Sequence, residues 1–419
     1  MALSIPTGKF CFGTRRTIET LPATESAQMT SIDAPSPSVT PSSHAQSADY
    51  AAQTSLRVWQ QRSLMTLAAL KAATPRTPLR VLALPGFAEA HVLIKDERAH
   101  ASGSLKHRLA MSLFEQALVE GWLKPGRPVI EASSGSTAVS EAWLARQLGL
   151  EFIAVIPTTT APDKLAAIRA EGGKVVKVDD AALLCQHAQR LADVSGGHFI
   201  DQFRHAATAS DWRSTTSLPG ECLSQLASHG LPPLEAVFLG AGTGGSAATF
   251  ARHLRLKGER AKVIGVDPEH SVYTACWQHF QTHGVRHTAL TPPCASNPIE
   301  GIGRPCVLEA FRPEDFDDYL SIEDSRSQAA ALWLAEHAER TEQEELAAGP
   351  STGTAFAGLL QTLEARRMRG ESLRGSWLIL ACDSASRYAS TFGNQAWHEQ
   401  HQVRLAPHRQ WLKSLTARS

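Results

Sequence analysis

The feature that most constrains the fold of this chain is a repeated alternation between short apolar runs and longer stretches with helical spacing. Several of these runs are rich in Val and Ile on both faces, as in strands that are buried between two layers of helices. Seven runs stand out, at residues 91–94, 128–132, 152–156, 174–178, 236–239, 262–266 and 377–381. The alternation predicts an α/β fold with mostly parallel sheets flanked by helices.

The composition excludes several classes of function. The 419 residues include 41 basic and 41 acidic side chains, so we expect no nucleic acid and no anionic membrane as a partner. No apolar run approaches the ~18 residues of a membrane span, and the first thirty residues lack the apolar core of a secretory signal. The seven cysteines form no CxxC pair and no metal-ligand spacing with the 17 histidines. We therefore expect reduced thiols, no metal site and a cytoplasmic protein.

Residues 1–50 differ in composition from the rest of the chain. Ser, Thr, Pro and Ala dominate from Thr20 to Ser47, with few large apolar residues. Such a segment buries too little surface to offset the entropy of ordering it, which predicts a disordered N-terminal extension. It faintly resembles a transit peptide, and it equally fits a dispensable extension before a start at Met29.

A cluster of cations marks the segment 101–109. Lys106 lies in the first turn of a predicted helix, where the positive helix dipole usually recruits Asp or Glu, yet His107 and Arg108 follow it directly. The dipole and the neighbouring cations disfavour an ammonium, and so favour the neutral amine that forms Schiff bases with carbonyl compounds. A solvated basic turn without any chemistry would show the same residues.

Three loops follow predicted strands, where α/β folds place their chemistry. The first, at residues 131–137, carries Ser133, Ser134, Ser136 and Thr137. Its hydroxyls and the free amides of the next helix fit a small anion such as a carboxylate, or they only cap that helix. The third loop, at residues 382–388, contains Ser384, and a lone serine after a buried strand is usually a cap.

The second loop, at residues 240–246, is rich in glycine. Glycine lets the backbone approach an anion closely, and the hydroxyls of Thr243 and Ser246 with the helix-start amides would donate to a phosphate. The loop also matches G-x-G-x-x-G, with Asp267 at the end of the next predicted strand, which is the layout of a dinucleotide-binding unit. A nicotinamide dehydrogenase and a purely structural glycine turn are therefore alternatives.

Taken as a set, these motifs resemble the cysteine synthase and cystathionine β-synthase family, the fold type II enzymes that use pyridoxal 5′-phosphate. The resemblance runs from Thr77 to about Thr391, with the motifs in the family's order. It makes the nicotinamide alternative weak. It also implies a large cofactor-binding domain of residues 55–105 and 210–395, a small mobile α/β domain of residues 106–209, a C-terminal tail of residues 396–419 and a homodimer.

The resemblance also implies roles for single residues. Ser-Leu-Lys-His-Arg at 104–108 resembles the family's Ser-Val-Lys-Asp-Arg, which makes Lys106 the Schiff-base lysine and the base for the substrate's α-proton. Ser136 stands where the family has an asparagine that contacts the cofactor, and Ser384 would face the pyridine nitrogen. The substrate carboxylate would be held by Ser133, Ser134, Thr137 and Gln202, and the cofactor phosphate by Gly242, Thr243, Gly244, Gly245 and Ser246.

The motifs with Lys106, with Glu131 to Glu141 and with Ile299 to Pro305 are most similar to those of bacterial L-cysteine desulfhydrases. The resemblance therefore implies a carbon–sulfur lyase that converts L-cysteine to hydrogen sulfide, pyruvate and ammonia through an aminoacrylate. One alternative is a cysteine synthase that works from an activated serine, because both reactions share the aminoacrylate. Another is a cofactor-binding relative without turnover that acts through a partner, suggested by the replacements at His107 and Ser136.

Overall fold

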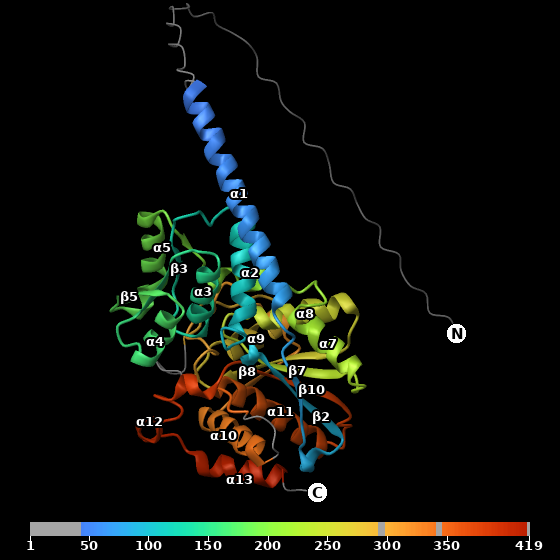
Figure 1. Cartoon of the computed structure of the whole chain (residues 1–419). Helices are drawn as coiled ribbons and strands as arrows, with labels where there is room; N and C mark the ends of the chain where they lie inside the picture. The colour runs from blue at the N-terminus through green and yellow to red at the C-terminus, as the bar shows by residue number, and fades with distance from the viewer. Residues whose placement is uncertain (1–42, 292–297, 341–345, 417–419) are drawn as a thin grey trace, which may run out of the picture. The chain divides into compact units, whose positions relative to one another are not determined.

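The computed structural model describes residues 43–291, 298–340 and 346–416, and it confirms the predicted α/β fold (Figure 1). The strands form two sheets, one of six strands and one of four. All strand pairs are parallel except β1 with β2, so the sheets are mostly parallel, as the apolar runs predicted. Six of the seven predicted runs lie within a strand, and the seventh, 128–132, extends one residue beyond β3 at each end.

The larger sheet has the strand order β1-β2-β10-β7-β8-β9. Its members are β1 (Leu79–Leu82), β2 (Ala90–Asp96), β10 (Gly375–Ala381), β7 (Leu234–Gly240), β8 (Lys262–Pro268) and β9 (Asp318–Ile322). Alternate residues of these strands point into two separate cores, so that Val92 and Phe238 lie in one core while Leu93 and Val237 lie in the other. Both faces are therefore buried, which explains why the strands are apolar at consecutive positions.

The smaller sheet has the order β5-β4-β3-β6. Its strands are β5 (Lys174–Val178), β4 (Phe152–Pro157), β3 (Val129–Glu131) and β6 (His198–Phe199). All of them are parallel, so their carboxyl ends share one edge of the sheet. The hydroxyl-rich loop follows β3 at that edge.

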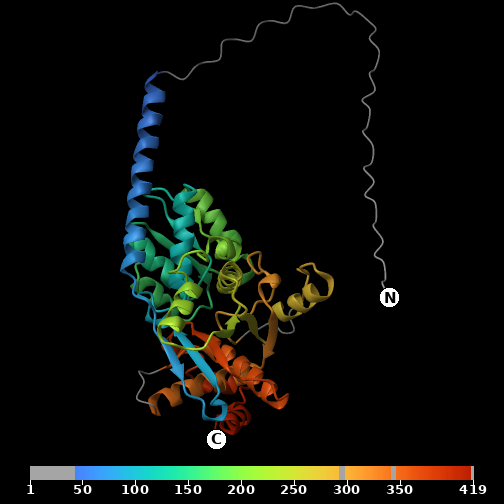
Figure 2. The ribbon, with the colours of Figure 1, turned by 90° about the vertical axis from the view of Figure 1, so that its right-hand side faces the viewer.

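Thirteen helices are described around the two sheets. They are α1 (Ser43–Ala73), α2 (Lys106–Val119), α3 (Ser136–Gln147), α4 (Pro162–Ala170), α5 (Leu184–Ser195), α6 (Gln202–Ala209), α7 (Leu218–Ser228), α8 (Gly245–Lys257), α9 (Tyr273–His283), α10 (Asp324–Arg340), α11 (Pro350–Met368), α12 (Gln395–Gln400) and α13 (Leu405–Thr416). Helices α10, α11 and α13, in orange and red, gather on one face of the larger sheet (Figures 1 and 2). Helices α7 and α8 contribute to the core on the other face.

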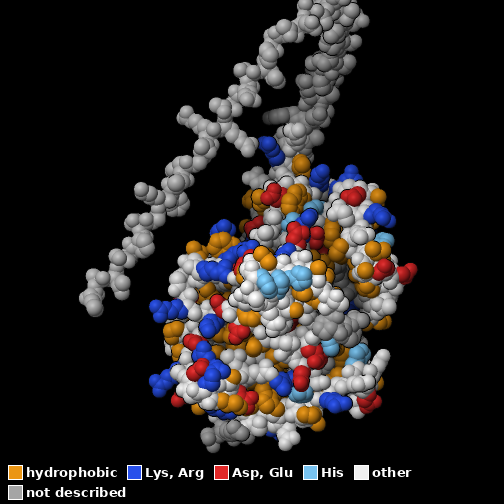
Figure 3. All heavy atoms as spheres, turned by 180° about the vertical axis from the view of Figure 1, so that it is seen from behind, with side chains coloured by type: hydrophobic (Ala, Val, Ile, Leu, Met, Phe, Trp, Pro, Cys, Tyr) orange, Lys and Arg blue, Asp and Glu red, His pale blue; other side chains and the backbone are white. Residues whose placement is uncertain are grey.

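The surface charges and the apolarity of the helices were also compared with the composition. On the face that Figure 3 shows, basic and acidic side chains are interspersed, with no large region of one sign. None of the helices among the described residues has the length and apolarity needed to cross a membrane.

The structure adds elements that the apolar runs did not indicate. Strands β1, β6 and β9 were not predicted; β6 has only two residues, too short to show a pattern. The predicted disordered extension lies mostly outside the described residues, and its last residues, from Ser43, begin α1. The predicted C-terminal tail contains most of α12 and all of α13, whose Leu412 and Leu415 are buried. The division into a large and a mobile small domain stays a prediction.

Candidate active site

Lys106 is the first residue of α2, and the preceding turn is tied to the end of β10. The Leu105 amide donates to the Cys382 carbonyl at 2.7 Å, and Ser104 forms a β-bridge with Asp383. The turn also requires glycine at position 103, where φ is +72° and a Cβ would lie 2.8 Å from the Arg387 guanidinium. The lysine is thereby held over the carboxyl end of the larger sheet.

The surroundings of Lys106 favour its neutral form. Burial, and then the positive charge of Arg304, lower the pKa of the amine below its usual range. The acids Asp383 and Glu141 act in the opposite direction without cancelling the shift. A neutral amine is the nucleophilic form, so this shift favours a reactive lysine, although it comes from burial and Arg304 and not from His107 and Arg108 as the sequence interpretation supposed.

The glycine-rich loop and the lysine line one cavity of about 360 Å³, to which Lys106, Thr243, Gly245 and Ser246 contribute. Gly244 adopts φ +87° as the N-cap residue of α8, and the buried Thr243 hydroxyl accepts a weak hydrogen bond from the Gly245 amide at 3.4 Å. The start of a 13-residue helix thus faces the same space as the amine. Free amides and hydroxyls at a helix start form a binding site for a phosphate.

Close packing behind this loop explains one of its glycines. A Cβ at Gly242 would lie 2.2 Å from the Gly301 carbonyl oxygen, so no larger residue fits there without a shift of the backbone. The Gly242 carbonyl accepts hydrogen bonds from the Tyr273 hydroxyl at 3.0 Å and from Arg304 Nε at 3.2 Å. These bonds fix the loop between β7 and α8.

The hydroxyl-rich loop reaches the start of α3 and is connected to Gln202. The Thr137 hydroxyl donates to the side-chain oxygen Oε1 of Gln202 at 2.8 Å, and the backbone amide of Gln202 donates to Glu131 Oε2 at 3.2 Å. Ser133 and Ser134 are partly exposed in the same loop. The structure therefore brings the predicted carboxylate-binding residues Thr137 and Gln202 into direct contact.

Ser136 contacts the loop after β10 across the two sheets. Its hydroxyl donates to Asp383 Oδ2 at 3.0 Å and accepts from Arg387 at 3.3 Å, while the Tyr388 hydroxyl donates to the same Asp383 oxygen at 2.7 Å. Ser134 and Ser136 line a second cavity of about 190 Å³. The Ser384 hydroxyl instead contacts Ser386 at 2.9 Å, and Ser384 lines neither cavity.

The sequence interpretation missed three buried acids, which lie on β3, on α3 and in the loop after β10. We call them the acid group: Glu131, Glu141 and Asp383. Burial raises the pKa of each carboxyl, to about 8 for Glu131. The only signal in the sequence was the presence of acids inside apolar or hydroxyl-rich stretches.

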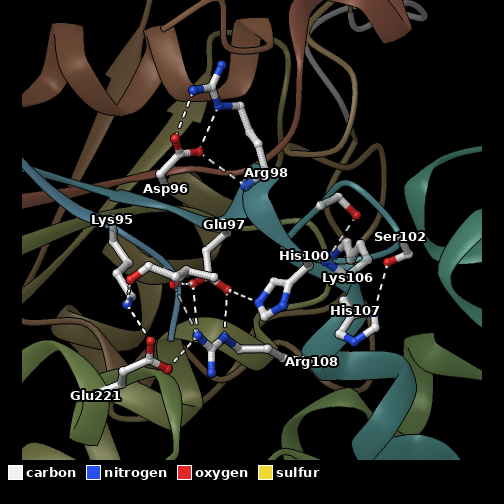
Figure 4. A network of polar contacts seen from close by, with 12 residues as sticks. Lys95, Asp96, Glu97, Arg98, His100, Ser102, Lys106, His107, Arg108 and Glu221 are labelled. Carbon is white, nitrogen blue, oxygen red and sulfur yellow. Dashed lines mark hydrogen bonds and ion pairs between the residues drawn. The ribbon is translucent and has the colours of Figure 1, made fainter. Parts of the chain in front are cut away.

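On the other side of α2 lies a second set of charges, which we call the paired network: the buried Lys95, Glu97 and Glu221 with the half-buried Arg108 (Figure 4). Arg108 donates to Glu97 at 2.7 Å and to Glu221 at 2.7 Å, and Lys95 donates to Glu221 at 2.7 Å. Burial alone would raise the pKa of Glu97, but Arg108 and His100 outweigh it and lower that pKa. Every member of this network therefore forms an ion pair with a member of opposite charge.

His107 lies beside this network, where the family has an acid. Its Nδ1 lies 3.0 Å from the Ser102 hydroxyl, which lies 2.9 Å from the Ser140 hydroxyl of α3. Burial, followed by the charges of His100 and Arg108, lowers its pKa to about 4, so the ring is neutral at physiological pH. Figure 4 shows this ring next to Lys106.

The family is established by comparison with known proteins. A family model described as "Pyridoxal-phosphate dependent enzyme" matches residues 70–383, three quarters of the chain, and the chain belongs to this family. It therefore depends on pyridoxal phosphate. The residues present fit that cofactor, because a lysine of lowered pKa and a glycine-rich helix start line one cavity.

Within this family, the chain is similar to several individual enzymes. The chain is 39% identical over 309 residues to L-cysteine desulfhydrase Cds1 of Mycobacterium tuberculosis (strain ATCC 25177 / H37Ra), which covers 74% of this chain and 80% of the relative. It is 28% identical to a putative cysteine synthase of Sinorhizobium fredii (strain NBRC 101917 / NGR234), over 77% of this chain and 89% of the relative. The crystal structure of O-ureido-L-serine synthase, 24% identical, shares the fold with a TM-score of 0.63 over 77% of this chain and 93% of its own.

Proposed function

We propose that this enzyme is an L-cysteine desulfhydrase, which eliminates hydrogen sulfide from L-cysteine and releases pyruvate and ammonia. The observation that carries the proposal is the 39% identity to a desulfhydrase over 309 residues, which are 74% of this chain. The lowered pKa of the Lys106 amine supports it as well.

In this proposal, different residues of the chain have different roles in the reaction. Pyridoxal phosphate, when bound, supplies an electron sink that makes the α-proton of an amino acid acidic. We assign Lys106 to hold the cofactor and to take that proton at Nζ, for which its lowered pKa prepares it. The loop of Ser133, Ser134 and Thr137, with Gln202, binds the substrate carboxylate.

The phosphate-binding and ring-binding assignments belong to the same proposal. The amides and hydroxyls from Gly242 to Ser246 would bind the cofactor phosphate at the start of α8. Ser136 would contact the substrate side of the cofactor and Ser384 its ring nitrogen, and because neither residue lines the cavity of Lys106, these two assignments rest on the family resemblance. Because a hydroxyl leaves that nitrogen largely unprotonated, the electron sink is modest, which suits an elimination in which the β-substituent leaves.

A cysteine synthase is the second candidate, favoured by the similarity to the putative cysteine synthase. The two functions differ in what reaches the site after the β-substituent has left. A synthase protects the site from water until a sulfur nucleophile arrives, whereas a desulfhydrase releases its product to water.

A product assay tests the proposal. The purified protein is given L-cysteine alone, and sulfide and pyruvate are measured together. We expect equal amounts of both, loss of both in Lys106→Ala, and no change in the control Lys174→Ala, whose amine pairs at the surface with Glu151. Absence of pyruvate, with cysteine formed from O-acetylserine and sulfide, would show that the synthase is right.

A further inference from the structure

Three side chains that can bind a metal ion lie together at one edge of the larger sheet. Glu269 and His270 directly follow β8, and Asp324 begins α10, two residues after β9 ends. Because β8 and β9 are parallel neighbours, with Pro268 opposite Ile322, their carboxyl ends meet at this edge. One ligand atom from each of the three side chains lies within 4.8 Å of the other two.

The distances within this group fit the coordination of a small cation. His270 Nε2 lies 3.4 Å from Asp324 Oδ2, and the backbone amide of Asp324 donates to Glu269 Oε1 at 3.2 Å. Two ligands that each lie about 2.1 Å from a tetrahedral zinc ion are about 3.4 Å apart. The His270 and Asp324 atoms therefore already have the separation that such an ion requires, and the exposed side chain of Glu269 has room to adjust to it.

A second observation at the same place points to a ligand. Asp324 is only 6% exposed, yet its Oδ1 atom has no hydrogen-bond partner among the described residues. A buried carboxylate oxygen without a partner costs free energy, and coordination to a cation would offset that cost. The spacing of residues in the sequence does not indicate this group, because Asp324 is far along the chain from Glu269 and His270.

The surrounding charges do not neutralise the two acids of the group. Glu323, next to Asp324, pairs with His408 of α13 at 3.2 Å and lies 4.0 Å from Arg326. Helices α10 and α13 lie side by side (Figure 1). Within the described ranges, no Lys or Arg forms an ion pair with Glu269 or Asp324. Two carboxylates and a neutral imidazole together match a dication in charge.

We propose that Glu269, His270 and Asp324 form a binding site for a divalent transition-metal ion of the zinc type. The imidazole nitrogen favours zinc over magnesium and calcium, which prefer oxygen ligands alone. Zinc is four-coordinate in most protein sites, so the three side chains leave one position for water. That position is open to solvent, because Glu269 is exposed and His270 is partly exposed.

The proposed ion has a structural role. None of its three ligands lines the cavity of Lys106. The ion instead joins the connection between β8 and α9 to the start of α10. In that connection Ser271 Oγ accepts a hydrogen bond from the Arg304 amide, and the Tyr273 hydroxyl donates to the Gly242 carbonyl of the glycine-rich loop. The ion thus fixes a segment that supports this loop, and this role is independent of the substrate that the enzyme converts.

The first test is a zinc titration of the untagged, cofactor-bound protein after dialysis against a chelator. L-cysteine is left out, because thiols and sulfide bind zinc themselves. We expect one tightly bound zinc ion per chain, and an affinity about 100-fold weaker or less in His270→Gln, because loss of a ligand costs at least as much as loss of an outer contact. The matched control is His283→Gln, an exposed histidine of α9 that stacks on His279, and it should bind zinc normally.

Equal zinc affinity in His270→Gln and the unsubstituted protein would overturn the proposal. So would a loss in His283→Gln alone, because the ion would then lie on the histidines of α9. Should His270→Gln unfold at a lower temperature without zinc, Glu269→Gln replaces it, because this exposed side chain is not needed for packing. The same loss of zinc affinity is expected there.

The second test identifies the ligands and the effect of the ion on the fold. Zinc should raise the unfolding temperature of the unsubstituted protein and of His283→Gln but not of His270→Gln, and magnesium at the same concentration should have no effect. X-ray absorption at the zinc edge should show nitrogen and oxygen at about 2.0–2.2 Å and no sulfur at about 2.3 Å. A sulfur ligand, or equal stabilisation by magnesium, would contradict the proposed site.

Discussion

The two sets of buried charges on either side of α2 are built in opposite ways. In the paired network, Glu97 accepts hydrogen bonds from Thr77, His100 and Arg108, and Glu221 bonds both Lys95 and Arg108. In the acid group, Glu141 has no partner among the described residues, and Asp383 Oδ1 has none either. Arg108 of the paired network lies two residues after Lys106, and Glu141 and Asp383 of the acid group act on the charge of Lys106.

The difference separates charges that hold the fold together from charges that serve the site. A buried charge with opposite partners is neutralised in place and fixes the elements that carry it, here β2, α2 and α7. In the acid group, burial instead raises the pKa of each carboxyl. Buried unpaired acids beside a reactive amine are therefore the better indication of chemistry.

The largest effect on stability is expected from Arg108→Met. The substitution leaves Glu97 and Glu221 buried without their shared partner, which should cost about 3–5 kcal/mol of the free energy of unfolding. The matched control is Arg146→Met, whose exposed pair with Glu171 is worth about 0–1 kcal/mol. Urea unfolding measures both, and equal losses in the two variants would contradict the contrast drawn here.

Glu141→Leu should change the free energy of unfolding in the opposite direction to Arg108→Met. Removing an unpartnered buried carboxyl and filling its place with an apolar side chain should raise the free energy of unfolding by about 1–3 kcal/mol. Urea unfolding measures this change. A variant that is both less stable and fully active would show that Glu141 belongs with the structural charges.

His107→Asn should remove part of the acid sensitivity of the fold. The pKa of His107 is about 4 in the folded chain and about 6.5 in an unfolded one, so between these values only the unfolded chain binds the proton. Stability then falls as the pH falls, by about 1.4 kcal/mol per pH unit at most. Urea unfolding at pH 7 and pH 5 should show a smaller difference in the variant; an unchanged difference would argue against a buried neutral ring.

Ser136→Ala should have the smallest effect, about 1 kcal/mol of the free energy of unfolding. The variant loses one hydrogen bond to Asp383, while the Tyr388 hydroxyl still donates to the same carboxylate oxygen. Urea unfolding and the affinity for pyridoxal phosphate are both measured. A loss above about 3 kcal/mol would mean that Ser136 is essential for holding the acid group in place.

Much of the fold could be predicted because a strand that is buried on both faces is apolar at consecutive positions, which is visible in the sequence. A strand such as β4, between β3 and β5 and under helices, must be apolar at consecutive positions, and residues 152–156 show this. The two-residue β6 and the edge strand β1 leave no such trace. Their places are determined by the neighbours with which they pair.

The same division applies to the active site. The sequence by itself determined Lys106 at a helix start and the glycines from Gly240 to Gly245, because a phosphate site needs particular backbone shapes that few residues adopt. Only the tertiary structure decided that His107 is neutral, that Ser136 bonds Asp383 and that Glu141 has no partner. These properties depend on burial and on charges from distant parts of the chain, and a local pattern carries no record of either.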